Sequence, residues 1–153
     1  GVVLAVERVS QFRAMILTEP QPADWVTDLV FRSCRDVHEH HCHMLHEGYL
    51  YRCPLPPFLP SYLRRLGGED YDPHADGVAL HAPGDLRARL LDFLTDAATP
   101  ASCRWCLGDL ACRQPHQQLA PAALRRPAQA PVTRANNLER LRVMHAMATH
   151  GAT

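Results

Sequence analysis

The sequence contains no lysine: among its 153 residues all 16 basic side chains are arginine, and 16 acidic side chains balance them. The lack of lysine points to the codon usage of a GC-rich genome and says nothing about function. A formal net charge of zero argues against a surface built to bind polyanions. The arginines also do not cluster with aromatic residues as they do in nucleic-acid-binding domains. We therefore expect no nucleic-acid partner.

Long apolar runs are missing as well. No stretch reaches the roughly 18 apolar residues of a membrane-spanning helix, and the apolar N-terminus lacks the basic flank and cleavage site of a signal peptide. We expect a cytoplasmic protein without a membrane partner. In that reducing compartment, clustered cysteines bind metals more often than they form disulfides. The length suits one domain and excludes a complete (β/α)₈ barrel, which needs about 250 residues.

The sequence is rich in soft metal ligands, with six cysteines and ten histidines. The cysteines form two groups of three: Cys34, Cys42 and Cys53, then Cys103, Cys106 and Cys112. A C-x2-C turn, as in the second group, lets two thiolates bind one metal centre, and Gly108 permits the chain reversal that follows such a turn. Thiolate groups of this kind suit either Zn²⁺ or an iron–sulfur cluster.

This spacing resembles the auxiliary-cluster domain, called SPASM or in its shorter form Twitch, that follows the barrel of radical S-adenosylmethionine enzymes. That family reads C-x9–15-G-x4-C, then C-x2-C-x5-C-x3-C, then a last C. Here 13 residues separate Cys34 from Gly48, and four separate Gly48 from Cys53. The second group fits C-x2-C-x5-C. His116 stands where the family has its next cysteine, and no final cysteine follows.

The resemblance implies an auxiliary [4Fe–4S] cluster that passes electrons or anchors a substrate. Carried over residue by residue, the one-cluster form gives Cys34, Cys53, Cys103 and Cys106 as its ligands. Cys42 and Cys112 could then complete a second site, with His116 as a non-thiolate partner. The two-cluster form instead groups Cys34, Cys42 and Cys53 with position 116. The resemblance therefore leaves open whether the chain binds one cluster or two.

The C-x3-C-x2-C loop that holds the S-adenosylmethionine cluster in this family is absent from the sequence. The resemblance therefore implies the C-terminal portion of such an enzyme, not catalytic as an isolated chain. Its expected partners are the barrel of the same parent chain and a substrate that the sequence does not identify. The alternative is a structural zinc-binding interaction module, because zinc sites accept mixed cysteine and histidine ligands.

The expected fold is a small α+β domain stabilised by a metal cluster, with a β-hairpin and a cysteine knuckle surrounded by short helices. Residues 1–22 would be the tail of a preceding barrel, including a strand over 12–17. Residues 23–118 would form the cluster domain, and 119–153 an Ala/Pro-rich linker with a C-terminal helix. Within the cluster domain and beyond it, we expect a hairpin at 43–53, a strand at 78–80, a knuckle at 103–112, and helices at 24–34, 61–66, 85–94 and 137–147.

Several side chains carry further expectations. Glu47-Gly48 should form the hairpin turn, because Gly accepts a positive φ. Trp25, Leu29 and Val30 should share the inward face of the first helix. Asp85 should cap the helix at 85–94, whose inward face would carry Leu86, Leu90, Phe93 and Leu94. Trp105 should shield the metal site. Arg52 and Arg104, each beside a cysteine, either offset the charge of a thiolate-bound cluster or are ordinary surface residues. The histidines at 38–46 should be mostly solvated.

Overall fold

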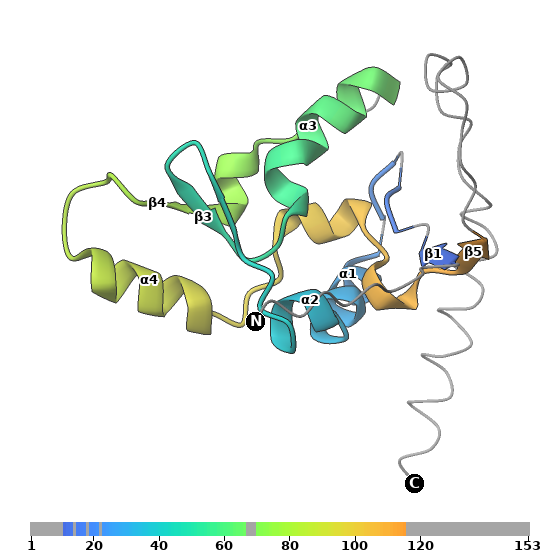
Figure 1. Ribbon diagram of the computed structural model, residues 1–153, viewed down its shortest axis with the longest axis horizontal. Helices are drawn as coiled ribbons and strands as arrows, with labels where there is room; N and C mark the ends of the chain where they lie inside the picture. The colour runs from blue at the N-terminus through green and yellow to red at the C-terminus, as the bar shows by residue number, and fades with distance from the viewer. Residues whose placement is uncertain (1–10, 14, 18, 22, 67–69, 116–153) are drawn as a thin grey trace, which may run out of the picture.

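The structure is a computed structural model that describes residues 11–13, 15–17, 19–21, 23–66 and 70–115 (Figure 1). The strands are β1 (Gln11–Arg13), β2 (Met44–His46), β3 (Tyr49–Tyr51), β4 (Gly77–Ala79) and β5 (Arg113–Pro115). The α-helices are α1 (Asp24–Arg32), α2 (Arg35–His38), α3 (Leu55–Leu66) and α4 (Leu86–Thr95). Three 3₁₀ turns are η1 (Pro73–Asp76), η2 (Ala101–Trp105) and η3 (Gly108–Leu110). Helices with a small antiparallel sheet agree with the expected α+β class.

The sheet is antiparallel, in the order β2-β3-β4. Its first two strands form the predicted hairpin, in which Met44 pairs with Tyr51. Both turn residues have positive φ, +48° at Glu47 and +79° at Gly48, the backbone of a type I′ turn whose twist matches the strands. The predicted third strand is also present, displaced by one residue, and pairs with β3.

Gly77 of β4 allows this sheet to pack around Tyr51, whose side chain is 1% exposed. A Cβ at position 77 would lie 2.6 Å from Cε1 of the Tyr51 ring, closer than atoms approach without a shift. The tyrosine ring therefore fills the space that a side chain on β4 would occupy.

The helix predicted at 61–66 is wrong at its start, because α3 begins at Leu55. Pro56 and Pro57 lie in its first turn, where backbone N–H groups have no intrahelical partner and proline is tolerated. Pro60 lies inside the helix and removes one hydrogen bond, a local cost that burial outweighs. Leu59 and Leu63 of α3 are fully buried and form one core cluster with Trp105.

A second core cluster joins α1 to the segments around residues 17 and 107. Its buried members are Leu17, Val26, Val30, Leu107 and Ala111. Helix α1 is confirmed, and Val30 is buried as expected. Trp25 and Leu29 are only half-buried, although they pack against the same cluster, and Val26 and Phe31 are buried instead.

The strand predicted at 12–17 is split. Only Gln11–Arg13 forms a strand, β1, which pairs with β5. Further along, Ile16 forms an isolated bridge with Cys106, and the N–H of Leu17 donates to the carbonyl of Trp105 over 2.8 Å. The described part of this N-terminal segment therefore lies along the cysteine knuckle.

Helix α4 is confirmed together with its cap, since Asp85 Oδ1 accepts from the N–H groups of Arg87 (2.9 Å) and Ala88 (3.2 Å). Its expected inward face is wrong. No residue of α4 is buried, and Leu86 and Leu94 are 39% and 43% exposed. The helix lies at the side of the sheet (Figure 1), where Arg89 donates to the carbonyls of Ala79 and Ala82. Hydrogen bonds to carbonyls of β4 and of the loop that follows it, and not burial in a core, hold the helix there.

The predicted helix at 137–147 lies outside the described residues, as does His116. None of the helices in the described ranges combines the length and apolar character needed to cross a bilayer.

Gly77→Ala is expected to lower the free energy of unfolding by about 1–3 kcal/mol, because the added methyl overpacks against the Tyr51 ring. Urea denaturation measures the change. In a Tyr51→Leu background the same substitution should cost less, since the clashing ring edge is gone. An equal cost in both backgrounds would contradict the packing described here.

Candidate metal centre

Four cysteines from three separate parts of the chain line one small cavity: Cys34, Cys53, Cys103 and Cys106. Cys34 lies between α1 and α2, Cys53 between β3 and α3, and the other two in and directly after η2. The cavity measures about 30 Å³. Its walls are largely apolar and include Val30, Val37, Leu55, Pro56 and Pro100. The sequence places these four thiols up to 72 residues apart, and the fold brings them together.

The other candidate ligands are not part of this cavity. Cys42 is exposed and Cys112 is half-buried, and neither lines it. His116 lies outside the described residues. All six cysteines are free thiols.

A groove of about 280 Å³ adjoins the cavity and gives the cysteines a second face. Cys34, Cys53 and Cys106 line both spaces. The groove's other walls are mainly apolar, with Met15, Ile16, Leu55 and Phe58, and Phe58 is 49% exposed. Residues 15 and 16 reach the site through long-range contacts, the bridge of Ile16 to Cys106 and the hydrogen bond from the N–H of Leu107 to the carbonyl of Met15, so no sequence motif indicates this groove.

The C-x2-C knuckle has the expected glycine turn. Gly108 adopts a φ of +47°, and its N–H donates to Cys106 Sγ over 3.2 Å. An N–H···S hydrogen bond favours the thiolate form of a cysteine. The backbone amides of Leu55 and Val37 have the same effect on Cys53 and Cys34, respectively.

Burial acts in the opposite direction and is stronger. It raises the pKa of all four thiols, that of Cys53 to about 11 and that of Cys106 to about 12. Mutual repulsion between the thiolates raises the pKa of Cys103 and of Cys106 further. The four sulfurs are therefore neutral at pH 7 when nothing offsets their charge. Only a cation at the centre would let all four ionise together.

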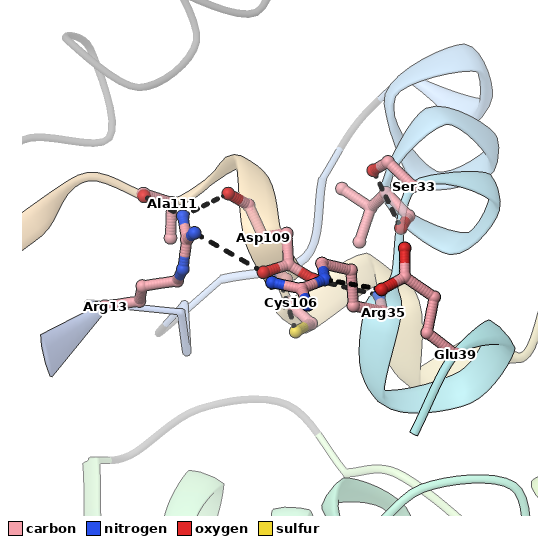
Figure 2. Close-up of polar contacts among 9 residues, drawn as sticks. Arg13, Ser33, Arg35, Glu39, Cys106, Asp109 and Ala111 are labelled. Atoms are coloured by element: carbon pink, nitrogen blue, oxygen red, sulfur yellow. Dashed lines mark hydrogen bonds and ion pairs between the residues drawn. The ribbon is translucent and has the colours of Figure 1, made fainter. Parts of the chain in front are cut away.

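A polar network anchors the knuckle to the neighbouring segments (Figure 2). Asp109 lies in η3, three residues after Cys106. Its carboxylate accepts from the backbone N–H of Arg35 over 2.9 Å and pairs with Arg13 over 3.5 Å. Arg13 also donates to the carbonyls of Asp109 and Ala111. One carboxylate thereby ties β1 and the start of α2 to the loop that carries Cys106.

Asp76 anchors the other side of the knuckle. Its carboxylate, 7% exposed, lines the cysteine cavity. It accepts hydrogen bonds from the N–H groups of Ala101 and Ser102, both at 2.7 Å, and from the Tyr71 hydroxyl at 2.6 Å. These bonds hold the start of η2, and so Cys103, against η1. Burial and the carboxylate together raise the pKa of Tyr71. Sequence inspection missed this residue, because it stands in a segment that looks like a solvated loop.

The two arginines beside cysteines have different environments. Arg52 lines the cavity, and its side chain is 7% exposed. It lies near the rings of Phe31 and Phe93, 5.8 and 5.0 Å from their centroids. Arg104 instead pairs with Asp24 at the surface.

The expected shielding role of Trp105 is wrong. Its side chain is buried, but it packs with Leu59 and Leu63, with its ring 5.4 Å from that of Tyr71. Trp105 does not line the cavity, because the 3₁₀ turn of η2 directs it into the core. The valine, leucine and proline side chains of the cavity wall exclude water in its place.

Among the described residues there is no group of three or more His, Cys, Asp or Glu side chains that could hold a metal ion. A single Zn²⁺, with Zn–S bonds of about 2.3 Å, would bring its sulfurs to within about 4 Å of one another. The four cysteines therefore share a cavity without forming a ready-made site for one ion.

No protein-family model matches the chain, and no curated protein is similar enough in sequence to be recognised as a relative. The functional argument therefore rests on the residues of this chain.

Asp76→Asn is expected to lower the free energy of unfolding by about 2–4 kcal/mol, because an amide replaces a buried charged acceptor of three hydrogen bonds. Urea denaturation measures this loss. Asp92→Asn on exposed α4 is the matched control and should change stability by less than about 0.5 kcal/mol. Similar values for both variants would contradict the anchoring role of Asp76.

Proposed function

We propose that Cys34, Cys53, Cys103 and Cys106 bind a [4Fe–4S] cluster, and that the chain is the auxiliary-cluster portion of a radical S-adenosylmethionine enzyme. The observation that carries this proposal is the convergence of four thiols, from three separate segments, on one apolar cavity. They are the same four cysteines that the one-cluster family pattern selects from six.

The chemistry of the four cysteines favours a metal centre over a purely structural role. Four free thiols around one cavity add little packing that valine or leucine would not supply better. Backbone N–H groups face at least three of the sulfurs and favour the thiolate, although burial disfavours it. A cationic centre resolves this conflict, because binding to metal deprotonates the thiols.

An iron–sulfur cluster suits the arrangement better than a single zinc ion. The described part of the chain contains no ready-made group for one ion, whereas a cubane spreads its four thiolates over four iron atoms and so keeps them further apart. The closed cavity alone, about 30 Å³, has room for little more than water. The cluster would therefore extend into the adjoining groove, which three of the four cysteines also line.

Four cysteine ligands favour electron transfer as the role of this cluster. When each iron of a cubane carries a protein thiolate, no iron is left open to bind a substrate. Such a cluster supplies one-electron exchange. The groove leaves one face of the site open to a redox partner. That partner would be the barrel of the parent enzyme with its substrate. Asp76 and Arg52, on the cavity wall, would tune the reduction potential in opposite directions.

Anaerobic purification of the chain is expected to give a brown protein with about four iron and four acid-labile sulfide per chain. Metal analysis and a sulfide assay check this result. A colourless protein that holds stoichiometric zinc and no sulfide would contradict the cluster and would favour a zinc-binding structural module.

Single Cys→Ala substitutions rank the ligands. Replacement of Cys34, Cys53, Cys103 or Cys106 is expected to remove at least half of the bound iron, since each anchors one iron of the cubane. Cys42→Ala and Cys112→Ala are the matched controls and should keep the full iron content, with circular dichroism reporting the fold of every variant. The ligand set would be refuted if any of the first four could be replaced without loss of iron in a folded protein.

A further inference from the structure

A second and larger cavity lies on the other side of the wall that closes the cysteine site. It measures about 700 Å³, within the range of pockets that bind small organic ligands. It lies between the C-terminal end of α1, α2 with the loop that follows it, and the C-terminal end of α4. Val37 and Arg52 line both cavities, so the two sites are neighbours without being one site.

Arginines outnumber carboxylates in the lining of this pocket. Its walls include Arg32, Arg52 and three histidines, against a single carboxylate, that of Asp96. Arg52 is already engaged, because it pairs with Asp96 over 3.7 Å and donates to the carbonyls of Phe93 and Ala98. Arg32, in contrast, makes no ion pair within the described part of the chain. It is the cation that a ligand can reach.

The three histidines of the pocket are each held through one ring nitrogen by a backbone carbonyl. His38 Nε2 lies 2.8 Å from the carbonyl oxygen of Phe31, His41 Nδ1 3.1 Å from that of Val37, and His43 Nδ1 3.3 Å from that of Arg52. Such a bond fixes the ring and assigns the N–H to that nitrogen. The second ring nitrogen of each histidine has no partner in the described ranges. His41 also adopts a φ of +48°, an uncommon backbone for a residue other than glycine.

The remaining walls are apolar. Phe31, 4% exposed, contributes a buried aromatic side chain, and Leu94, 43% exposed, a leucine at the end of α4. The free nitrogens of the histidines are acceptors, because the N–H of each ring already bonds a carbonyl. A ligand that matches these walls therefore needs an anionic group for Arg32 and a compact apolar body for Phe31 and Leu94.

We propose that this pocket binds a small carboxylic acid with a compact apolar body, such as an aryl-substituted alkanoate. The carboxylate lies against Arg32, and the apolar body contacts Phe31 and Leu94. The site does not depend on what the four cysteines bind, since none of them lines it.

Isothermal titration calorimetry of the full chain with 3-phenylpropionate tests this assignment. We expect saturable binding with a Kd of about 1 mM or tighter, as suits a ligand of this size. The neutral isostere 3-phenylpropan-1-ol should bind about tenfold more weakly, because it cannot form the charge-assisted bonds. Absence of binding by the acid, or equal affinity for the two compounds, overturns the proposal.

Two pairs of matched variants locate the bound acid. Arg32→Gln should weaken binding about tenfold, whereas Arg87→Gln, an exposed position outside the pocket, should leave it unchanged. Leu94→Ala should weaken binding about threefold through lost apolar contact, whereas Leu91→Ala, an exposed leucine on the same helix but outside the pocket, should not. Full affinity in both Arg32→Gln and Leu94→Ala places the acid elsewhere and refutes the site.

Discussion

Four sulfur atoms around one apolar cavity impose an electrostatic constraint on this fold. As thiolates, the four sulfurs repel one another and lose their hydration. As thiols, they are weak acceptors for the backbone N–H groups that face them. Either state alone is unfavourable, and a central cation relieves both costs. The three segments that carry the cysteines also meet through two small apolar core clusters, one that joins α1 to Leu107 and one that joins α3 to Trp105.

Polar cross-links supplement those small cores. Asp76 fastens η1 to η2, Asp109 fastens the knuckle to β1 and α2, and Arg52 fastens the end of β3 to the end of α4. Each bridges segments that are distant in the sequence, and each lies beside a cysteine of the cavity or within three residues of one. The rigidity of the domain is therefore concentrated where the thiols must be positioned, whereas α4, which carries none of them, has no buried residue.

Local chemistry made part of this arrangement predictable. The hairpin follows from Glu47-Gly48, the start of α4 from Asp85, and the knuckle turn from Gly108, because each depends on a few adjacent residues. The start of α3 was not predictable from proline content alone, since the two prolines Pro56 and Pro57 suit a first turn as well as they end a strand. The direction of Trp105 and the anchoring of η2 by Asp76 depend on contacts across 25 or more residues, which spacing along the chain does not encode. The four cysteines at the cavity could be selected only because their spacing resembles a family pattern. The histidine-lined pocket was not predicted, because its residues look like an ordinary solvated loop in the sequence.

The wall shared by the two cavities has a thermodynamic consequence. Val37 and Arg52 face the cysteines on one side and the larger pocket on the other, so the wall there is formed by single side chains. Occupancy of either cavity restrains the same two side chains. If both proposed sites are filled, any factor by which the pocket ligand changes the affinity of the cysteine site is, by linkage, also the factor by which the metal changes the affinity of the pocket.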